Sequence, residues 1–227
     1  TPMDLEKEAK EKKMNPYMLT SFVDGSKTMI EMAALANYLD FDIDIDGMHG
    51  PNSTYDELNS IFIPKTSGGI LENTNVVDFA FGVAPGVFAI VYSEDDYVNY
   101  EMEYLKMGKG PYWTLYRPYH LTSLEIPRTI MKLMVEKETQ LSAKKWNVEV
   151  VAHSKKDLKA GTNLGSIGGE NIYGKAMRVE NSKNLAPLGI AENNIVNSEV
   201  KKGEPIEIEN IDITDNQLYK YWLSQNS

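Results

Sequence analysis

Cysteine is absent from this sequence of 227 residues, and its absence removes several kinds of chemistry. A protein without thiols forms no disulfide bond, has no thiolate nucleophile and builds no zinc site on cysteine ligands. Basic residues are also fewer than acidic ones, 23 Lys and Arg against 33 Asp and Glu, which gives a formal net charge of −10. Because nucleic-acid binding needs clustered Lys and Arg facing phosphates, this balance argues against a nucleic-acid partner.

Long hydrophobic runs are missing as well. No apolar stretch has the roughly 20 residues that a helix needs to cross a bilayer, so we expect no membrane partner. Residues 1–13 are charged and amphipathic, unlike the apolar core of a secretory signal, and we expect a cytoplasmic protein. The hydrophobic fraction of 42% and the charged fraction of 25% are ordinary for a globular chain, and the length allows two small domains.

The first 143 residues mix helical and strand patterns. Apolar residues recur at helical spacing within residues 1–13, 27–36, 96–107 and 126–138. Strand-like apolar runs cover residues 18–23, 41–46, 75–81, 87–92 and 112–117. A glycine-rich turn joins the runs 75–81 and 87–92, which are therefore predicted to be neighbouring strands. We expect residues 1–143 to form an α+β domain whose sheet is mixed or mostly antiparallel, with helices on one face.

The pattern changes after residue 143. Short strand-like runs punctuated by glycine begin with residues 147–152 and continue to residue 208, and a short helix is predicted over residues 215–223. We therefore expect residues 144–227 to form a small all-β domain with a C-terminal helix.

The segment from Thr20 to Glu31 gathers hydroxyls, carboxylates and a lysine where a predicted strand leads into a helix, as active-site segments often do. Asp24 lies in the turn, while Lys27 and Glu31 are four residues apart and so share one helical face. Lys27 could donate a hydrogen bond to a substrate oxygen, with Asp24 or Glu31 balancing its charge. The competing interpretation is a surface ion pair between Lys27 and Glu31, worth about 0.3 kcal/mol.

Further candidates lie on predicted loops. His49 follows the strand predicted over residues 41–46. It either faces a ligand or is an ordinary polar residue of a loop. His120 follows Tyr119 in an aromatic run, and it is either a proton-exchanging substrate contact or a buried structural histidine. The turn that ends in Gly86 could approach a phosphate, although such turns are also common between strands.

A divalent cation is a further possibility that the sequence raises. The plausible oxygen and nitrogen donors in the first segment are Glu31, Asp46 and His49, which form no compact metal motif. The alternating aspartates of residues 41–46 can equally be the solvated face of a strand.

A set of hairpin-like turns after residue 143 is shared with a known domain. The runs are Asp157-Leu158-Lys159-Ala160-Gly161, Gly168-Gly169, Leu185, Pro187-Leu188-Gly189 and Val200-Lys201-Lys202-Gly203-Glu204-Pro205-Ile206. On these runs the C-terminal module resembles a SAF domain, the β-clip unit related to type III antifreeze proteins and to the C-termini of sialic acid synthases.

Short runs in the first part of the chain carry a second resemblance. They are Ser21-Phe22, Asp24-Gly25, Lys27, Pro85-Gly86-Val87-Phe88, Gly108, Gly110-Pro111, Pro118-Tyr119-His120-Leu121, Glu125 and Pro127. They resemble the catalytic part of NAD(P)-dependent oxidoreductases with a C-terminal SAF domain, the homoserine dehydrogenase-like and 1-deoxyxylulose-5-phosphate reductoisomerase-like enzymes. Full-length members of that family have an upstream Rossmann domain, and this sequence has no Gly-x-Gly-x-x-Gly after a predicted strand. The resemblance thus implies a fragment that is inactive alone, with the NAD(P)H site mostly outside it.

The resemblance also implies a function and residue roles. The expected activity is reduction or oxidation of a small hydroxylated carbonyl substrate, with or without a phosphate group, by a homo-oligomer in which the α+β domain also serves dimerisation. Its expected catalytic residues are Lys27, Asp24, Glu31 and His120, with Asp24 and Lys27 as an acid/base or orienting pair. The expected substrate-binding residues are Ser21, His49, Tyr119 and Gly86. Two alternatives stay open, a SAF-type module that binds a sugar or sugar acid, and a purely structural or dimerisation role.

Overall fold

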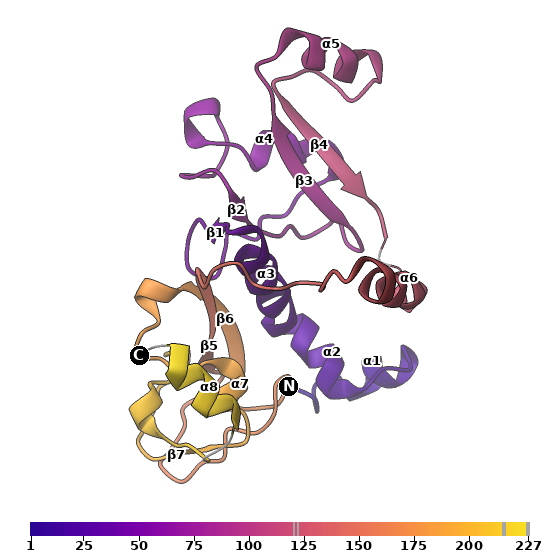
Figure 1. Ribbon diagram of the computed structural model, residues 1–227. Coiled ribbons are helices and arrows are strands. Elements are labelled where there is room, and N and C mark those ends of the chain that lie inside the picture. The colour runs from indigo at the N-terminus through magenta and orange to yellow at the C-terminus, as the bar shows by residue number, and fades with distance from the viewer. Residues whose placement is uncertain (120, 122, 215–216, 226–227) are drawn as a thin grey trace. The chain divides into compact units, whose positions relative to one another are not determined.

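The computed structural model describes residues 1–119, 121, 123–214 and 217–225 (Figure 1). The chain forms two compact units that are not consecutive in sequence. Unit 1 consists of Thr1–Gly47 together with Ala143–Ser227, and unit 2 of Met48–Ser142. The domain division between residues 143 and 144 stays a prediction. Helices and small separate sheets are mixed throughout, which confirms the α+β class, although the strands form two-stranded sheets rather than one larger sheet.

Unit 1 contains helices and strands from both ends of the chain. Its elements before residue 47 are α1 (Glu6–Glu11), α2 (Pro16–Val23), α3 (Ser26–Leu39) and β1 (Asp42–Ile43). Those after residue 143 are β5 (Val148–Ser154), β6 (Ile172–Arg178), η4 (Val179–Asn181), α7 (Leu188–Ala191), β7 (Ile195–Val196), η5 (Ile208–Asn210), β8 (Ile211–Asp212) and α8 (Gln217–Gln225).

The strand expected over residues 18–23 is wrong, because this segment is helix α2. Its start is set by Asn15, whose side chain accepts a hydrogen bond from the Tyr17 amide at 2.8 Å, and by Pro16 in the first turn. The apolar residues that suggested a strand sit on a helix whose inner side buries Leu19 and Thr20. The predicted strand-to-helix transition is therefore a helix–turn–helix, and only the helix that begins at Ser26 is confirmed.

Helix α3 packs on the antiparallel hairpin of β5 and β6, as Figure 1 shows. The buried residues Ala33 and Ala36 face this hairpin, in which Val148 and Val151 are also buried. Burial of a valine side chain contributes about 1.5–3 kcal/mol, so the contact is a large part of the core of unit 1.

Polar side chains fix both ends of α3 on the hairpin. Near its C-terminus, the Asn37 side chain accepts hydrogen bonds from the Asn147 and Val148 amides at 2.9 and 3.0 Å. At its N-terminus, the buried Ser26 hydroxyl accepts a hydrogen bond from the Gly174 amide at 2.8 Å. The register of α3 on the sheet is thus set by hydrogen bonds as well as by apolar packing.

Short β-contacts extend the hairpin into the β-rich part that was expected after residue 143. Antiparallel bridges outside the named strands join Val151 to Pro187, His153 to Pro205, Leu158 to Val200, Asn163 to Ile195 and Leu185 to Glu207. The predicted C-terminal helix is present as α8 in the described residues. None of the helices described here combines the length and the apolar character needed to cross a bilayer.

Unit 2 is built around a two-stranded antiparallel sheet. Its elements are η1 (Tyr55–Glu57), α4 (Leu58–Ile61), η2 (Lys65–Ser67), β2 (Val76–Val77), β3 (Val87–Tyr92), α5 (Asp96–Tyr104), β4 (Tyr112–Arg117), α6 (Ile126–Met131) and the π-helical turn η3 (Lys132–Glu136). Strand β3 pairs with β4, from Val87 opposite Arg117 to Tyr92 opposite Tyr112. The expectation that residues 75–81 neighbour β3 is therefore wrong.

Of the run 75–81 only Val76–Val77 is a strand, and β3 pairs with β4 instead. Strand β3 buries one face. Phe88 and Ile90 alternate onto an apolar cluster formed by Leu58, Phe62 and Leu71, with the Phe62 and Phe88 rings 5.1 Å apart. Ala89 between them is exposed, so the opposite face of β3 is open.

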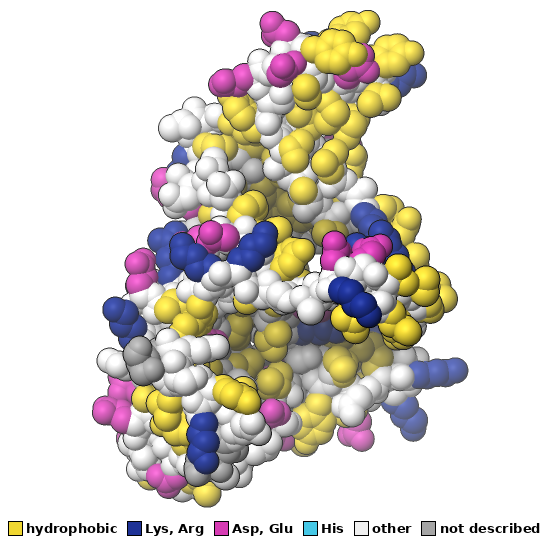
Figure 2. All heavy atoms as spheres, viewed as in Figure 1, with side chains coloured by type: hydrophobic (Ala, Val, Ile, Leu, Met, Phe, Trp, Pro, Cys, Tyr) yellow, Lys and Arg dark blue, Asp and Glu magenta, His cyan; other side chains and the backbone are white. Residues whose placement is uncertain are grey.

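A band of hydrophobic side chains lies on the surface of unit 2 (Figure 2). On α5 the tyrosines Tyr97, Tyr100 and Tyr104 are 71%, 63% and 72% exposed. Exposed apolar groups of this size commonly mark a contact with another molecule.

Candidate functional site

Unit 1 contains an open cavity with a volume of about 330 Å³. This size is in the range of small-molecule sites. Its lining residues come from the first residue, from α2 and its C-cap, from the end of β5, from β6 and from a later turn. They are Thr1, Thr20, Val23, Asp24, Ser154, Lys155, Tyr173, Lys202 and Gly203. A second hollow, beside Glu149, has about 10 Å³ and so holds at most a water molecule. The larger cavity is therefore the candidate binding site.

A buried ion pair forms one wall of this cavity. The Lys155 ammonium lies 2.6 Å from the Asp24 carboxylate, and the two side chains are 14% and 13% exposed. Asp24 also accepts a hydrogen bond from the Ser26 amide at 2.9 Å, while the ammonium donates to the Gly169 carbonyl at 2.6 Å. Removing one partner of such a pair leaves an uncompensated charge, which typically costs about 3–5 kcal/mol.

Hydroxyl groups supply the other polar atoms of the wall. Burial raises the pKa of the Tyr173 phenol, so this group keeps its proton at neutral pH. The Thr20 hydroxyl donates to the Pro16 carbonyl at 2.8 Å, and the Ser154 hydroxyl donates to the Lys201 carbonyl. Both residues are buried, with 1% of Thr20 and 0% of Ser154 exposed, so their hydroxyls bond to the backbone and support the wall from behind. The groups that the cavity offers to a ligand are thus the ammonium and the phenol, both hydrogen-bond donors.

His153 lies beside this wall, but its side chain packs in the protein interior. Its ring is 5% exposed and lies 5.5 Å from the ring of Tyr173. Burial lowers its pKa, so it stays neutral at neutral pH.

The structure places Lys27 and Glu31 apart from these groups. Their charged atoms are 3.7 Å apart on α3, with side chains 36% and 54% exposed, which confirms the predicted i,i+4 pairing. Lys27 also lies 4.4 Å above the ring of Phe22. The cation paired with Asp24 is Lys155 instead. The catalytic roles of Lys27 and Glu31 stay predictions.

Ser21 is buried next to the candidate site residues of α2. Its hydroxyl donates to the Met18 carbonyl at 2.7 Å, within its own helix. It is not among the residues that line the cavity. Its role in substrate binding stays a prediction.

His49 belongs to unit 2, where it is held by a buried carboxylate. Its Nδ1 lies 2.8 Å from Asp78 Oδ2, and the Asp78 side chain is only 4% exposed. Asp78 Oδ1 accepts from the amides of His49 and Gly50 at 3.1 Å and of Phe79 at 2.8 Å. This histidine is therefore fixed in position by its own backbone and by its ring.

Two other predicted residues of unit 2 have packing roles in the structure. Gly86 lies against the Tyr116 ring, which would be about 2.7 Å from any Cβ at this position, so a side chain has no room there. Tyr119 is 48% exposed and lies under the Arg117 guanidinium, 4.9 Å from its ring centre. His120 lies outside the described residues, so its predicted role stays a prediction.

The described residues do not fit a divalent cation. They contain no group of three or more His, Asp or Glu side chains placed to share a metal ion. Of the expected donors, Asp46 instead accepts hydrogen bonds from the Arg178 amide and the Asn181 side chain, both at 3.0 Å.

The described strands form no Rossmann site either. The pairs β3–β4, β5–β6 and β7–β8 are antiparallel, and the parallel contacts of Asn52 with Phe81 and of Pro64 with Leu71 are isolated bridges. A Rossmann site needs parallel strands and a glycine-rich turn into a helix.

The sequence analysis did not single out three residues that have notable positions in the structure. They are Asp78, Lys155 and Tyr173. Lys155 and Tyr173 lie in the β-rich part, whose turns suggested a domain but no site. A signal for Asp78 was present, because it is a lone carboxylate within the apolar run of residues 75–81.

Comparison with known proteins supplies a family. Residues 1–126 match the family model described as oxidoreductase DRL, catalytic domain. No curated protein matches the sequence significantly. The matched segment is more than half of the chain and includes Asp24, His49 and Asp78, whereas Lys155 and Tyr173 lie beyond it. The chain therefore belongs to the oxidoreductase family defined by the DRL catalytic domain.

Proposed function

We propose that this chain provides the substrate-binding groups of an NAD(P)-dependent oxidoreductase that acts on a small hydroxylated carbonyl compound, with or without a phosphate group. The family match supports an oxidoreductase. The observation that carries the rest is the ion pair of Asp24 and Lys155 in the wall of the unit 1 cavity. We also propose that residues 144–227 are the SAF-type module of this enzyme.

The ammonium of Lys155 is suited to hold a carbonyl oxygen. It donates one of its three N–H bonds to the Gly169 carbonyl at 2.6 Å, and it lies 2.6 Å from the Asp24 carboxylate as an ion pair. A further N–H bond can be donated to a substrate oxygen. A fixed ammonium in a partly water-excluded site stabilises negative charge that develops on that oxygen during reaction. Asp24 keeps the ammonium in place and balances its charge before substrate binds.

The Tyr173 phenol supports a hydroxylated substrate. It lines the cavity and can donate a hydrogen bond to a second substrate oxygen. Lys202, on the turn at the rim, offers a further positive charge that would suit a phosphate or carboxylate. The set thus matches a compact polyoxygenated molecule.

The nicotinamide cofactor belongs to the proposed full-length enzyme. Since the described strands form no Rossmann site, we assign the cofactor no contact with them. The same holds for a divalent cation.

A reductase assay on the full-length protein tests the proposal. Oxidation of NADPH and NADH would be followed by absorbance with a panel of hydroxyaldehydes, hydroxyketones and their phosphates. We expect turnover of at least one compound, and loss of most of it in Lys155→Met. The matched control is Lys156→Met, the next residue, whose exposed ammonium pairs with Glu170 at 3.8 Å. Absence of turnover with both nucleotides, or equal activity of the two variants, contradicts the proposal.

A second candidate function is a SAF-type module that binds a sugar or sugar acid without turnover. It is favoured by one observation, that Ser154, Lys155, Tyr173, Lys202 and Gly203 line the cavity and all belong to residues 144–227. Titration calorimetry of the full chain with sugar acids separates the two. Binding that Lys155→Met abolishes, in a protein with no reductase activity, would favour the module.

We propose in addition that the enzyme is a homo-oligomer, with the exposed tyrosines of α5 as the candidate contact surface. Sedimentation of wild type and of Tyr97→Ser/Tyr104→Ser tests this. A monomer at high concentration contradicts it.

A further inference from the structure

Three side chains of the unit 1 cavity donate hydrogen bonds to whatever it holds. The Lys155 ammonium is one, held in place by the Gly169 carbonyl and by Asp24. The other two are the Tyr173 phenol and the Lys202 ammonium, which line the same cavity. Within the part of the chain that the structure describes, neither of these two groups has a hydrogen-bond or ion-pair partner. The ligand must therefore present acceptor oxygens to them.

The pairing of β5 with β6 brings the first two donors together. Tyr173 lies opposite His153 in this hairpin. The ladder continues one step past Ser154, because the Lys155 amide donates to the Asn171 carbonyl at 2.8 Å. Lys155 and Tyr173 are therefore diagonal neighbours, which in antiparallel pairs lie about 7–8 Å apart and within reach of long side chains. Their donors can serve neighbouring oxygens of one small molecule.

Lys202 lies on a turn that is anchored to the end of β5. Its amide donates to Asp157 Oδ1 at 2.8 Å, and the next amide, of Gly203, donates to the Ser154 carbonyl at 2.9 Å. Gly203 has a φ of 84°, a conformation that glycine adopts without strain. The backbone that carries Lys202 is thus fixed beside the strand that leads into Lys155.

The charges of the cavity indicate how much negative charge a ligand carries. The charged side chains that line it are Asp24, Lys155 and Lys202. Asp24 balances Lys155 at 2.6 Å, so the uncompensated positive charge is that of Lys202. A phosphate monoester has a charge of about −1.5 to −2 at neutral pH, and its excess would lie near the Asp24 carboxylate. A carboxylate carries a single charge and matches the cavity.

We propose that the unit 1 cavity selects a 2-oxo acid, with the oxo oxygen on Lys155 and the carboxylate between Tyr173 and Lys202. Such a molecule presents acceptor oxygens to all three donors and carries the one negative charge that Lys202 lacks. The proposal rests on the proposed function for the oxo group as the reacting group, whereas the preference for a carboxylate does not depend on turnover.

The experiment compares three hydroxymethyl ketones that differ only in the group on the other side of the carbonyl. They are 3-hydroxy-2-oxopropanoate, the neutral 1,3-dihydroxypropanone and the monophosphate of the latter. Chemical-shift titration of the full chain without nucleotide gives a Kd for each. We expect the acid to bind about fivefold more tightly than the neutral ketone, the upper range for an ion pair that water reaches. The monophosphate should bind more weakly than the acid.

The variant Lys202→Met assigns this preference to one side chain. It removes the ammonium and keeps most of the exposed side-chain stem, and we expect it to bind the acid and the neutral ketone equally. The matched control is Lys201→Met in the same turn, whose ammonium pairs with Glu199 and does not line the cavity. This control should keep the fivefold preference. A change in the ratio of two Kd values separates recognition of the carboxylate from a general effect on the fold.

Each result decides the matter. The inference is overturned if none of the three ketones binds, if the acid binds no better than the neutral ketone, or if the monophosphate binds most tightly. It is also overturned if Lys202→Met keeps the preference or Lys201→Met loses it. A preference for the acid in a protein that turns over no compound contradicts the proposed function and supports this inference. Turnover with equal kcat/KM for the acid and the neutral ketone does the reverse.

Discussion

The Lys155 ammonium and the Asp24 carboxylate lie 2.6 Å apart, although they are distant in the sequence. One follows strand β5 and the other ends helix α2. The pair therefore joins the family-matched segment to the β-rich part of unit 1, and it shapes the candidate substrate cavity.

The strength of this ion pair can be measured by a double-mutant cycle. We expect Lys155→Met and Asp24→Asn each to lower the free energy of unfolding by about 3 kcal/mol, because each leaves a buried polar partner uncompensated. The double variant should lose much less than the sum of the two. Denaturant unfolding gives the values, with Lys156→Met as the exposed control. Additive losses would show that the two side chains do not interact.

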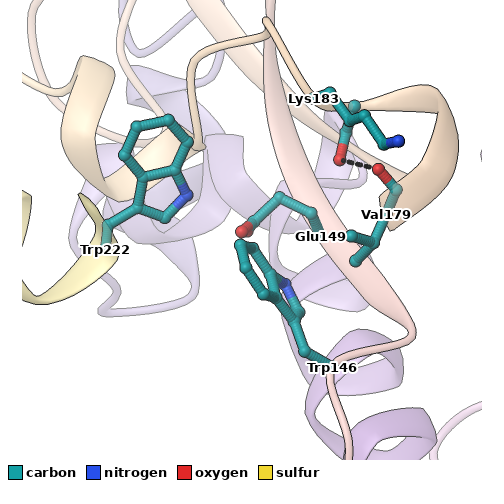
Figure 3. A pocket seen from close by; sticks show the side chains of 6 residues that line it. Trp146, Glu149, Val179, Lys183 and Trp222 are labelled. Carbon is teal, nitrogen blue, oxygen red and sulfur yellow. Dashed lines mark hydrogen bonds between the residues drawn. The ribbon is translucent and has the colours of Figure 1, made fainter. Parts of the chain in front are cut away.

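Glu149 should make unit 1 less stable as the pH rises. Figure 3 shows its side chain among Trp146, Trp222 and Val179, where Ser182 donates a hydrogen bond to the Val179 carbonyl at 3.2 Å. Burial raises the pKa of Glu149, and hydrogen bonds from the Val150 amide and the two indoles oppose this shift only partly. The folded state therefore binds the proton more tightly than the unfolded state. The stabilising contribution is complete below the ordinary glutamate pKa of about 4.3 and is lost as pH rises through the raised pKa.

The variant Glu149→Gln should remove this pH dependence, since the amide does not titrate. Denaturant unfolding at a series of pH values from about 4 to 8, a range that starts near the ordinary glutamate pKa, measures it. The exposed Glu180→Gln is the matched control and should keep the wild-type slope. A slope that is the same in wild type and Glu149→Gln would contradict the prediction.

Ser26→Ala should destabilise the contact between α3 and β6. The Ser26 hydroxyl is fully buried and accepts a hydrogen bond from the Gly174 amide at 2.8 Å. Its removal leaves that amide without an acceptor, which we expect to cost about 1–3 kcal/mol of unfolding free energy. Ser60→Ala, an exposed serine that bonds to the Glu57 carbonyl, should cost much less. Equal losses in the two variants would speak against the assigned role.

Tyr173→Phe should weaken ligand binding without loss of folding. The ring and its packing against His153 are retained, while the phenol donor in the cavity wall is removed. We expect Kd or KM to rise about tenfold, the effect of one hydrogen bond of about 1.4 kcal/mol. Calorimetry or steady-state kinetics with a substrate found in the panel measures it. An unchanged KM would place the ligand away from this wall.

Apolar periodicity and turn residues in the sequence were enough to predict several helices and strands. Helix α3, helix α5 and strands β3, β4 and β5 are found at the expected positions, because their apolar periodicity and bounding turns agree. Helix α2 was mistaken for a strand since four apolar residues outweighed the cap formed by Asn15 and Pro16. The partner of β3 was mistaken because adjacency in the sequence suggested residues 75–81, of which only Val76–Val77 is a strand, whereas β3 pairs with β4.

The residues of the candidate site were harder to predict from the sequence than the helices and strands. Asp24 lies in the predicted turn, but its pairing with Lys155 depends on how α3 docks on β5 and β6. No spacing rule connects two residues so far apart in the chain. Asp78 differs, since a single carboxylate in an apolar run already indicates that a buried group must bind to it.

The docking of α3 on β5 and β6 also bears on how the protein is made. The family-matched segment ends at residue 126, yet the strands that cover the inner side of α3 are synthesised afterwards. During translation the apolar side of α3 therefore stays exposed until β5 and β6 have been synthesised. Contacts between residues so distant in the sequence slow folding. A recombinant protein cut at residue 126 should expose that side and aggregate. The segment that matches the family model is thus shorter than the segment that buries the apolar side of α3.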